Sequence, residues 1–510
     1  MNNVNATITI EVNNLRVKIG GNDILKGIDF EIKTSESIGI VGESGSGKTM
    51  MVRSLIGLLP TIAKPSGDYK IDGEEFNLNA PEKHWRKVRG SEIGIIMQDP
   101  FTALDPLKKC GAQILDGVPK NKKPGFDVIA ALKEVGLPAD ISDRYPFELS
   151  GGQRQRIVIS AALATQPRLL IADEATTALD VITQKEILDL IDEIRNARGM
   201  PLIIITHNIR LAKTRCNRIL VMDNGRIVEQ GTAINVIEKP QSGATRTLIE
   251  ADRFLQAIPF ADSNSGGDML FRAVGLNKRF GSVTALDNVT VEVCCGESVG
   301  IAGLSGSGKT TLARCITGLT RADSGQIKYL GKNSIQLVFQ DPYSSLNPAH
   351  KIRFILEEAL KASGRPLNEL EEIISLAEVP SGLLNRKPAN LSGGQRQRVA
   401  IARALAPRPD MLICDESVSA LDVVVQNQIL KTLEKLRHER SLAVLFITHD
   451  LSVLRMIAGR VYIMNHGRIV ESGAVEKIFE DATDEYTKAL IQAASFGGKQ
   501  YAPGELTPSI

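Results

Sequence analysis

Cysteine is sparse and unpatterned in this sequence. Its 510 residues contain six cysteines, at positions 110, 216, 294, 295, 315 and 414. None of them lies in a C-x-x-C pair or at the spacing of a zinc finger, so neither a zinc site nor a disulfide framework is predicted. We expect reduced thiols, as in proteins of a reducing compartment.

An excess of one charge and long apolar runs are absent as well. The sequence has 61 basic and 59 acidic residues, a net charge of +2, which argues against a protein that binds nucleic acid through bulk positive charge. No apolar run approaches the roughly 18 residues needed to cross a bilayer. Residues 1–14 lack the basic start and apolar core of a secretory signal. We therefore expect no nucleic-acid partner and no membrane-spanning segment.

One series of motifs occurs twice. Five motifs recur in the same order: GESGSGKT at 42–49 and GLSGSGKT at 303–310, MQDP at 97–100 and FQDP at 339–342, LSGGQRQR at 149–156 and 391–398, LLIADE at 169–174 and MLICDE at 411–416, and IITH at 204–207 and FITH at 446–449. From the glutamine onward the offset is constant, since 340 − 98 = 242. Before it the offset is 309 − 48 = 261, so the second half is 19 residues shorter there. We predict two domains, 1–261 and 269–510, joined by the polar linker 262–268.

The pattern around the motifs predicts an α/β fold with two tandem P-loop NTPase domains. Short apolar stretches at 37–42 and 298–303 read as buried strands that run into glycine-rich loops. Strands that alternate with helices indicate a mainly parallel sheet in each half. Residues 98–149 and 340–391 are expected to form a largely helical lobe, and a smaller peripheral sheet is expected in each half.

The two glycine-rich loops have the sequence of a phosphate-binding loop. Glycines allow successive backbone N–H groups to face a phosphate, and the following helix adds its positive N-terminal end. The lysine would reach the β- and γ-phosphates, and the threonine would bind Mg²⁺. The predicted binding residues are Gly42, Ser44, Gly45, Ser46, Gly47, Lys48 and Thr49 in the first half, and Gly303, Ser305, Gly306, Ser307, Gly308, Lys309 and Thr310 in the second.

Acidic pairs and histidines at strand ends complete a predicted site for ATP and Mg²⁺ in each half. Open α/β sheets bind their ligands at the carboxyl ends of the strands. Asp173 and Asp415 are the predicted Mg²⁺ ligands. Glu174 and Glu416 would orient or deprotonate the attacking water. The histidine stands 34 residues after each aspartate and would donate to charge that develops on the γ-phosphate; these two catalytic residues are His207 and His449.

The motif LSGGQRQR, placed between a phosphate loop and an acidic pair, resembles the signature of ATP-binding cassettes of the ABC type. The resemblance implies that two cassettes meet head to tail and that the signature of one contacts the ATP of the other. The implied contacts are Ser150, Gly151, Gly152 and Gln153 in one signature, and Ser392, Gly393, Gly394 and Gln395 in the other. It also implies that Gln98 and Gln340 contact the γ-phosphate and Mg²⁺. Phe280 matches the place of an aromatic residue that stacks on adenine, where the first half has Ile19.

A narrower resemblance concerns the residues after each glutamine. DPFTALDP at 99–106, DPYSSLNP at 341–348 and DEYTKALIQAA at 484–494 are similar to the oligopeptide, dipeptide and nickel importer group. This implies the ATPase subunit of an importer, bound to two transmembrane permease subunits at the cytoplasmic face of the inner membrane. An extracytoplasmic solute-binding protein would be an indirect partner. The alternatives are a permease-free tandem ATPase that acts on ribosomes or DNA, and a fused sugar-importer ATPase.

Overall fold

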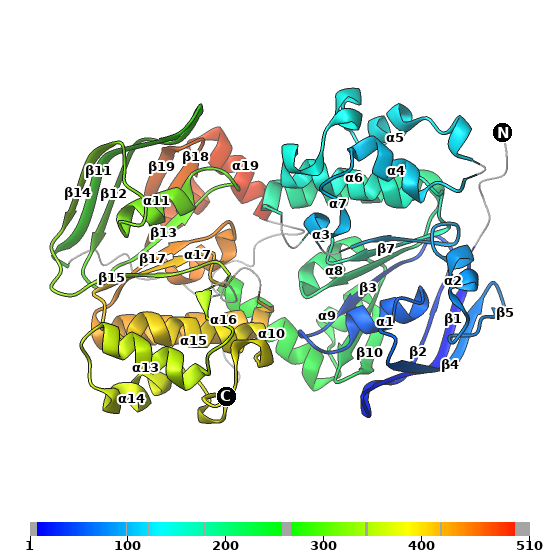
Figure 1. Cartoon of the computed structure of the whole chain (residues 1–510), viewed down its shortest axis with the longest axis horizontal. Coiled ribbons are helices and arrows are strands. Elements are labelled where there is room, and N and C mark those ends of the chain that lie inside the picture. Colours follow the sequence, from blue (N-terminus) through cyan, green and yellow to red (C-terminus); the bar gives the residue numbers. More distant parts are fainter. Residues whose placement is uncertain are drawn as a thin grey trace. The chain divides into compact units, whose positions relative to one another are not determined.

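The structure is a computed structural model, and it describes residues 8–97, 99–120, 122–176, 179–257, 267–341, 345–418 and 421–494, without the side chains of residues 101 and 254–257. The predicted metal and nucleotide ligand Gln98 and most of the predicted linker lie outside these residues. The chain divides into two compact units, Met1–Leu179 with Thr183–Asp252, and Asp180–Ile182 with Arg253–Ile510. Figure 1 shows the elements of both.

Unit one contains a small antiparallel sheet and a larger sheet that is mainly parallel. The small sheet has the order β2 (Asn22–Ile32), β1 (Ile10–Ile19), β4 (Ala63–Ile71), β5 (Glu74–Glu75). The large sheet has the order β10 (Arg226–Thr232), β9 (Arg218–Asp223), β3 (Ser37–Val41), β8 (Leu202–Thr206), β7 (Leu169–Asp173), β6 (Ile93–Ile96). Only the pair β9 and β10 is antiparallel in it. Its central strands are buried along their whole length, which explains their Ile, Leu and Val content.

The helices of unit one cover the large sheet and form a separate lobe. They are α1 (Lys48–Leu55), α2 (Glu82–Val88), α3 (Pro100–Ala103), α4 (Cys110–Gly117), α5 (Val128–Glu134), α6 (Gly151–Leu163), α7 (Val181–Arg198), α8 (Ile209–Arg215), α9 (Ala233–Glu238) and α10 (Gly243–Ala257). The lobe contains α4, α5 and the start of α6, drawn in cyan shades in Figure 1, and confirms the expected helical segment after residue 98.

Unit two repeats this architecture. Its small sheet has the order β12 (Val283–Cys294), β11 (Met269–Phe280), β14 (Ser324–Tyr329). Its large sheet has the order β15 (Ile335–Val338), β16 (Met411–Asp415), β17 (Ala443–Ile447), β13 (Ser298–Ala302), β18 (Arg460–Asn465), β19 (Arg468–Ala474). The helices are α11 (Lys309–Ile316), α13 (Ile352–Ala362), α14 (Leu370–Leu376), α15 (Gly393–Leu405), α16 (Val423–Arg440), α17 (Leu451–Ile457), α18 (Val475–Glu480) and α19 (Glu485–Ala494). The predicted α/β fold is confirmed.

The 19 residues that the second half lacks correspond to an edge strand of the small sheet and the helix that follows it. In unit one, β5 and α2 lie between β4 and β6. In unit two, β14 is followed after a short turn by β15, the partner of β6 in the repeat. The shortening therefore leaves the large sheet and its loops intact, as expected from the constant offset after the glutamine.

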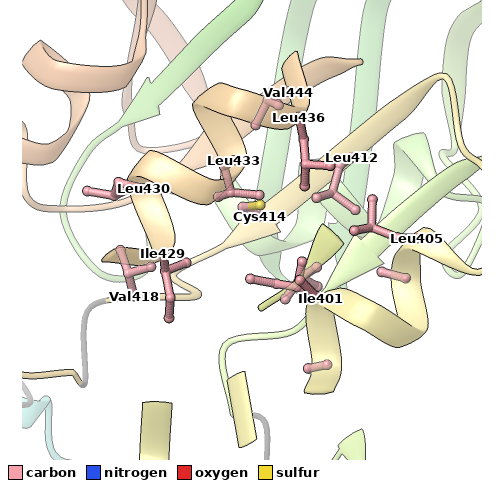
Figure 2. Packing of buried hydrophobic residues seen from close by; sticks show 14 of the residues in the cluster. Ile401, Leu405, Leu412, Cys414, Val418, Ile429, Leu430, Leu433, Leu436 and Val444 are labelled. Carbon is pink, nitrogen blue, oxygen red and sulfur yellow. The ribbon is translucent and has the colours of Figure 1, made fainter. Parts of the chain in front are cut away.

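One of the two apolar clusters of unit two lies where helices α15 and α16 pack on the large sheet. Figure 2 shows Leu433 and Leu436 of α16 close to Cys414 and Leu412 of β16, and Ile429 of the same helix close to Val418. The spacing of four and three residues places the three α16 side chains in one apolar stripe. Among the described residues, no helix combines the length and apolarity that a bilayer span needs.

Candidate nucleotide-binding sites

Each phosphate loop connects a buried strand to a helix. Residues 42–47 join β3 to α1, and residues 303–308 join β13 to α11. A Cβ atom on Gly42 would lie 2.2 Å from the backbone oxygen of Met222, and a Cβ atom on Gly303 would lie 2.2 Å from that of Met464. These close approaches require glycine at the first position of each loop.

The loop lysines are buried and bonded to their own loops. Lys48 Nζ donates to the carbonyl oxygens of Gly42 and Glu43, both at 2.8 Å. Lys309 Nζ donates in the same way to Gly303 and Leu304, again at 2.8 Å. Burial lowers the pKa of Lys309, against the opposing effect of nearby carboxylates. A buried ammonium group of this kind would gain from the negative charge of a phosphate.

A serine hydroxyl in each loop supports the same interpretation. Ser46 and Ser307 are 5% and 2% exposed, and their Oγ atoms are buried without a hydrogen-bond partner among the residues that the structure describes. Buried polar atoms without a partner are rare, because each costs free energy. A bound phosphate oxygen would accept from these hydroxyls and remove that cost.

A hydroxyl and a carboxylate meet behind each loop, where Mg²⁺ binding is predicted. Thr310 Oγ1 donates to Asp415 Oδ1 at 3.3 Å. Burial and the adjacent Glu174 raise the pKa of Asp173 to about 6, although Thr49 bonds to the same carboxylate. Burial also raises the pKa of Asp415. A bound cation would offset the free-energy cost of a charged carboxylate at this buried position. Oxygen donors are the ligands that Mg²⁺ prefers.

Mg²⁺ commonly binds one or two protein oxygens and takes its other ligands from water and phosphate. Among the described residues, no group of three or more His, Cys, Asp or Glu side chains is arranged to hold a metal by itself. The pairs Thr49 with Asp173 and Thr310 with Asp415 therefore fit Mg²⁺ that arrives with a nucleotide.

The acidic residue after each aspartate contacts the predicted histidine. Glu174 Oε1 lies 3.5 Å from His207 Nδ1, and Glu416 Oε1 lies 3.5 Å from His449 Nδ1. Glu416 Oε2 also accepts a hydrogen bond of 2.8 Å from Gln340 Nε2. The structure thus brings the predicted catalytic residues of each half together at the carboxyl ends of the parallel strands.

These contacts set the charges in unit two. Burial disfavours a charged Glu416, but the hydrogen bond and charge of His449, together with Lys309, lower its pKa. Burial disfavours a charged His449, but the Glu416 carboxylate raises the pKa of the histidine above its ordinary value. Glu416 is therefore ionised at neutral pH, the state that a general base requires.

The backbone of the two glutamates was not foreseen from the sequence. Glu174 and Glu416 have φ angles of 45° and 46°, in the left-handed region that non-glycine residues seldom adopt. Their N–H groups donate to Ile205 and Ile447 on the neighbouring strand, at 3.1 and 2.8 Å. Such conformations cluster at functional sites, where surrounding bonds enforce them. The sequence pattern, an apolar strand that ends in Asp-Glu, does not indicate this left-handed backbone conformation.

The two signature motifs start helices α6 and α15. Ser392 Oγ accepts from Gln395 N at 3.3 Å, and Gln395 Oε1 accepts from Ser392 N at 3.1 Å. Ser150 and Gln153 form the same capping box, with distances of 3.2 and 3.0 Å. The glycines that follow, Gly151, Gly152, Gly393 and Gly394, occupy the first turn of each helix. Their N–H groups belong to the unpaired donors of a helix start, which favour an anion.

The predicted adenine contact differs between the halves. Phe280 ends β11 with 52% of its surface exposed, and Lys278 Nζ lies 5.3 Å from the centre of its ring. Ile19 ends β1 at the matching place and packs against the core of unit one. Unit two therefore offers an exposed aromatic ring where unit one offers an aliphatic side chain.

Comparisons with known proteins agree with this geometry. The family model described as ABC transporter matches residues 25–177 and 286–419. The peptidoglycan transport ATP-binding protein YejF of Agrobacterium fabrum is 38% identical, over 92% of both chains. The glutathione import ATP-binding protein GsiA of Salmonella choleraesuis is 33% identical, over 92% of this chain and 86% of the relative. An archaeal ribosome recycling factor, aABCE1, solved with the stalk protein aP1, shares the fold at 20% identity, with a TM-score of 0.62 over 90% of both chains.

Proposed function

This chain belongs to the ABC transporter family and is an ATPase of that family, and from this premise we propose that it powers the import of peptides, nickel or a related small solute. One observation carries the proposal: relatives that match 92% of the chain, both halves included, are named for peptidoglycan transport and glutathione import. Peptidoglycan contains peptides and glutathione is a tripeptide, so peptides are the favoured class of solute. The likeness to the ribosome recycling factor is a likeness of fold and does not favour a ribosomal role.

The proposed ATP sites are composite and both hydrolytic. Each would combine the phosphate loop and acidic strand of one half with the signature of the other. The first would join Lys48, Thr49, Gln98, Asp173, Glu174 and His207 with Ser392, Gly393, Gly394 and Gln395. The second would join Lys309, Thr310, Gln340, Asp415, Glu416 and His449 with Ser150, Gly151, Gly152 and Gln153.

In the second site, the chemistry follows from the contacts of Glu416. The ionised carboxylate would accept a proton from water as the water oxygen attacks the γ-phosphorus. The bond from this phosphorus to the β–γ bridging oxygen then breaks, and ADP leaves. His449 and Lys309 would stabilise the negative charge on the transferred group. Mg²⁺ held by Thr310 and Asp415, with Gln340, would neutralise part of the phosphate charge. The matching residues of the first half would act alike.

The helical lobes offer surfaces for the proposed permease partners. In the first lobe, Leu107, Phe147 and Ile129 are 85%, 68% and 47% exposed. In the second, Phe354 and Leu367 are 48% and 43% exposed. Exposed apolar side chains can contribute to a protein contact, and this is the role proposed for these residues. Docking through the lobes would hold the chain at the cytoplasmic face of the inner membrane.

Purification from native membranes in mild detergent tests the importer proposal. Two multi-span proteins that copurify with the chain, and release of both by Leu107→Asp with Phe354→Asp, would support it. Ile62→Asp is a matched control, because Ile62 is 65% exposed but lies outside the lobes. Ribosomal proteins without a permease would contradict the importer and favour the permease-free alternative.

A further inference from the structure

The second phosphate loop is bonded to the last helix described in the chain. The Tyr486 hydroxyl accepts a hydrogen bond of 2.9 Å from the backbone N–H of Leu304, the second residue of the loop. Tyr486 lies in the first turn of α19, and both side chains pack against the same apolar core. Sequence reasoning missed this contact because 182 residues separate the partners.

Leu304 connects Tyr486 to the phosphate-binding lysine. Its carbonyl oxygen accepts the 2.8 Å hydrogen bond from Lys309 Nζ, while its N–H donates to Tyr486. The two bonds use both polar groups of one peptide residue. The position of Tyr486 therefore affects the backbone that holds the lysine at the entrance of the loop.

Helix α19 holds Tyr486 firmly. Glu471 Oε1 accepts from Thr483 N and from Thr483 Oγ1, both at 2.8 Å. Asp484 Oδ1 accepts from the N–H groups of Tyr486 and Thr487, at 3.0 and 3.1 Å. Thr487 is fully buried, and Leu490 one turn later is 3% exposed. The tyrosine thus projects from a helix start that is fixed by side-chain bonds and packing.

The first half has the same extension without the tyrosine. Glu229 accepts from the N–H groups of Gln241 and Ser242, at 2.9 to 3.1 Å, and matches Glu471 because 471 − 229 = 242. Thr245 is fully buried, as Thr487 is. At the same offset, 486 − 242 = 244, Tyr486 corresponds to Ala244, which has no hydroxyl. The tyrosine bond is therefore specific to the second loop.

We propose that Tyr486 is a positioning residue of the second ATP site, which it preorganises through Leu304; the first half has alanine, not tyrosine, at the matching position. The inference rests on the proposed function, because it takes ATP as the ligand of the loop. Without the bond, part of the nucleotide's binding free energy would be used to order the loop. Tyr486 acts on the loop through the backbone of Leu304 and would not itself contact the nucleotide, so its loss would weaken binding more than it slows the chemical step.

The test uses full-length chains in which one site is removed. In a Lys48→Ala chain, Tyr486→Phe should raise the Kd for a non-hydrolysable ATP analogue roughly two- to tenfold, the range for one lost hydrogen bond. In a Lys309→Ala chain, Tyr486→Phe should leave the Kd unchanged. The kcat of the Lys48→Ala chain with ATP should change less than its KM.

Tyr462→Phe is the matched control. The Tyr462 hydroxyl also accepts from a backbone N–H, that of Glu292 at 3.2 Å, but not from the phosphate loop. Equal Kd values for the Tyr486→Phe and parent chains, or an equal rise with Tyr462→Phe, would overturn the inference. No binding to a Lys48→Ala chain with Tyr486 intact would overturn the ATP site itself, and the inference with it.

Discussion

Replacing Gly394 by alanine tests why the signature has two glycines. An added Cβ atom would lie 2.3 Å from Cγ1 of Val425, in helix α16. Carbon atoms in contact are ordinarily about 3.5–4.0 Å apart, so the helices must shift or the valine must rotate. Valine has little freedom to rotate, because it is branched at Cβ. Packing between α15 and α16 therefore requires glycine here, whether or not nucleotide is bound.

The magnitude follows from two opposing effects. Overpacking costs about 1–3 kcal/mol, and replacing a helical glycine by alanine contributes about 0.5–1 kcal/mol of stability. The midpoints of these ranges give a net loss of about 1 kcal/mol, which lowers the Tm of a unit of this size by roughly 2–4 °C. Gly393→Ala is the control, because its Cβ would lie 3.4 Å from Leu421 Cδ2, an ordinary contact.

Scanning calorimetry of the nucleotide-free chain measures the difference. Gly394→Ala should lower the Tm of the second unit, whereas Gly393→Ala should leave it unchanged or raise it slightly. Val425→Ala should remove most of the effect of Gly394→Ala in a double-mutant cycle. Equal Tm values for the two glycine variants, or no recovery with Val425→Ala, would refute the packing argument.

Three further predictions concern the sites. Because the pKa of Asp173 is raised to about 6, its ionisation costs stability that is fully felt above pH 6. Asp173→Asn should therefore raise the Tm at pH 8 and change it little at pH 4. An equal change in Tm at the two pH values would contradict the raised pKa. Glu416→Gln should lower the pKa of His449, because burial then disfavours the charged histidine without the opposing effect of the Glu416 carboxylate. NMR titration of the histidine would measure this change. An unchanged pKa would contradict the interaction between Glu416 and His449. In single-site chains, ATP should bind more weakly to the site with Ile19 than to the site with Phe280, as calorimetric titration would measure. Phe280→Ala should weaken ATP binding at the second site roughly two- to tenfold and so remove this difference. Equal affinities of the two sites would contradict the stacking argument.

The repeat made much of the fold predictable. Strand residues such as 37–41 and 169–173 are apolar and end in a loop or acidic pair, so their burial and the parallel sheet could be predicted from local patterns. The grouping of Lys309, Glu416 and His449 followed from the rule that ligands bind at the carboxyl ends of such strands. Their catalytic roles stay predictions.

Other features depend on contacts that local patterns do not contain. The left-handed backbone of Glu416 is fixed by its bond to Ile447 on another strand. The bond from Leu304 to Tyr486 joins a loop to a helix far along the chain. The need for glycine at 394 comes from the facing side chain of Val425. Each is set by tertiary packing, which a single sequence does not specify locally.

The rate of ATP hydrolysis by glutamate variants tests the central claim, that both halves hold a hydrolytic site. Glu174→Gln and Glu416→Gln preserve shape and remove the base. We predict that each single variant retains measurable turnover. The double variant should bind ATP but hydrolyse it at least about 10²-fold more slowly than the parent chain. Turnover by the double variant close to that of the parent would contradict the assignment of both catalytic glutamates.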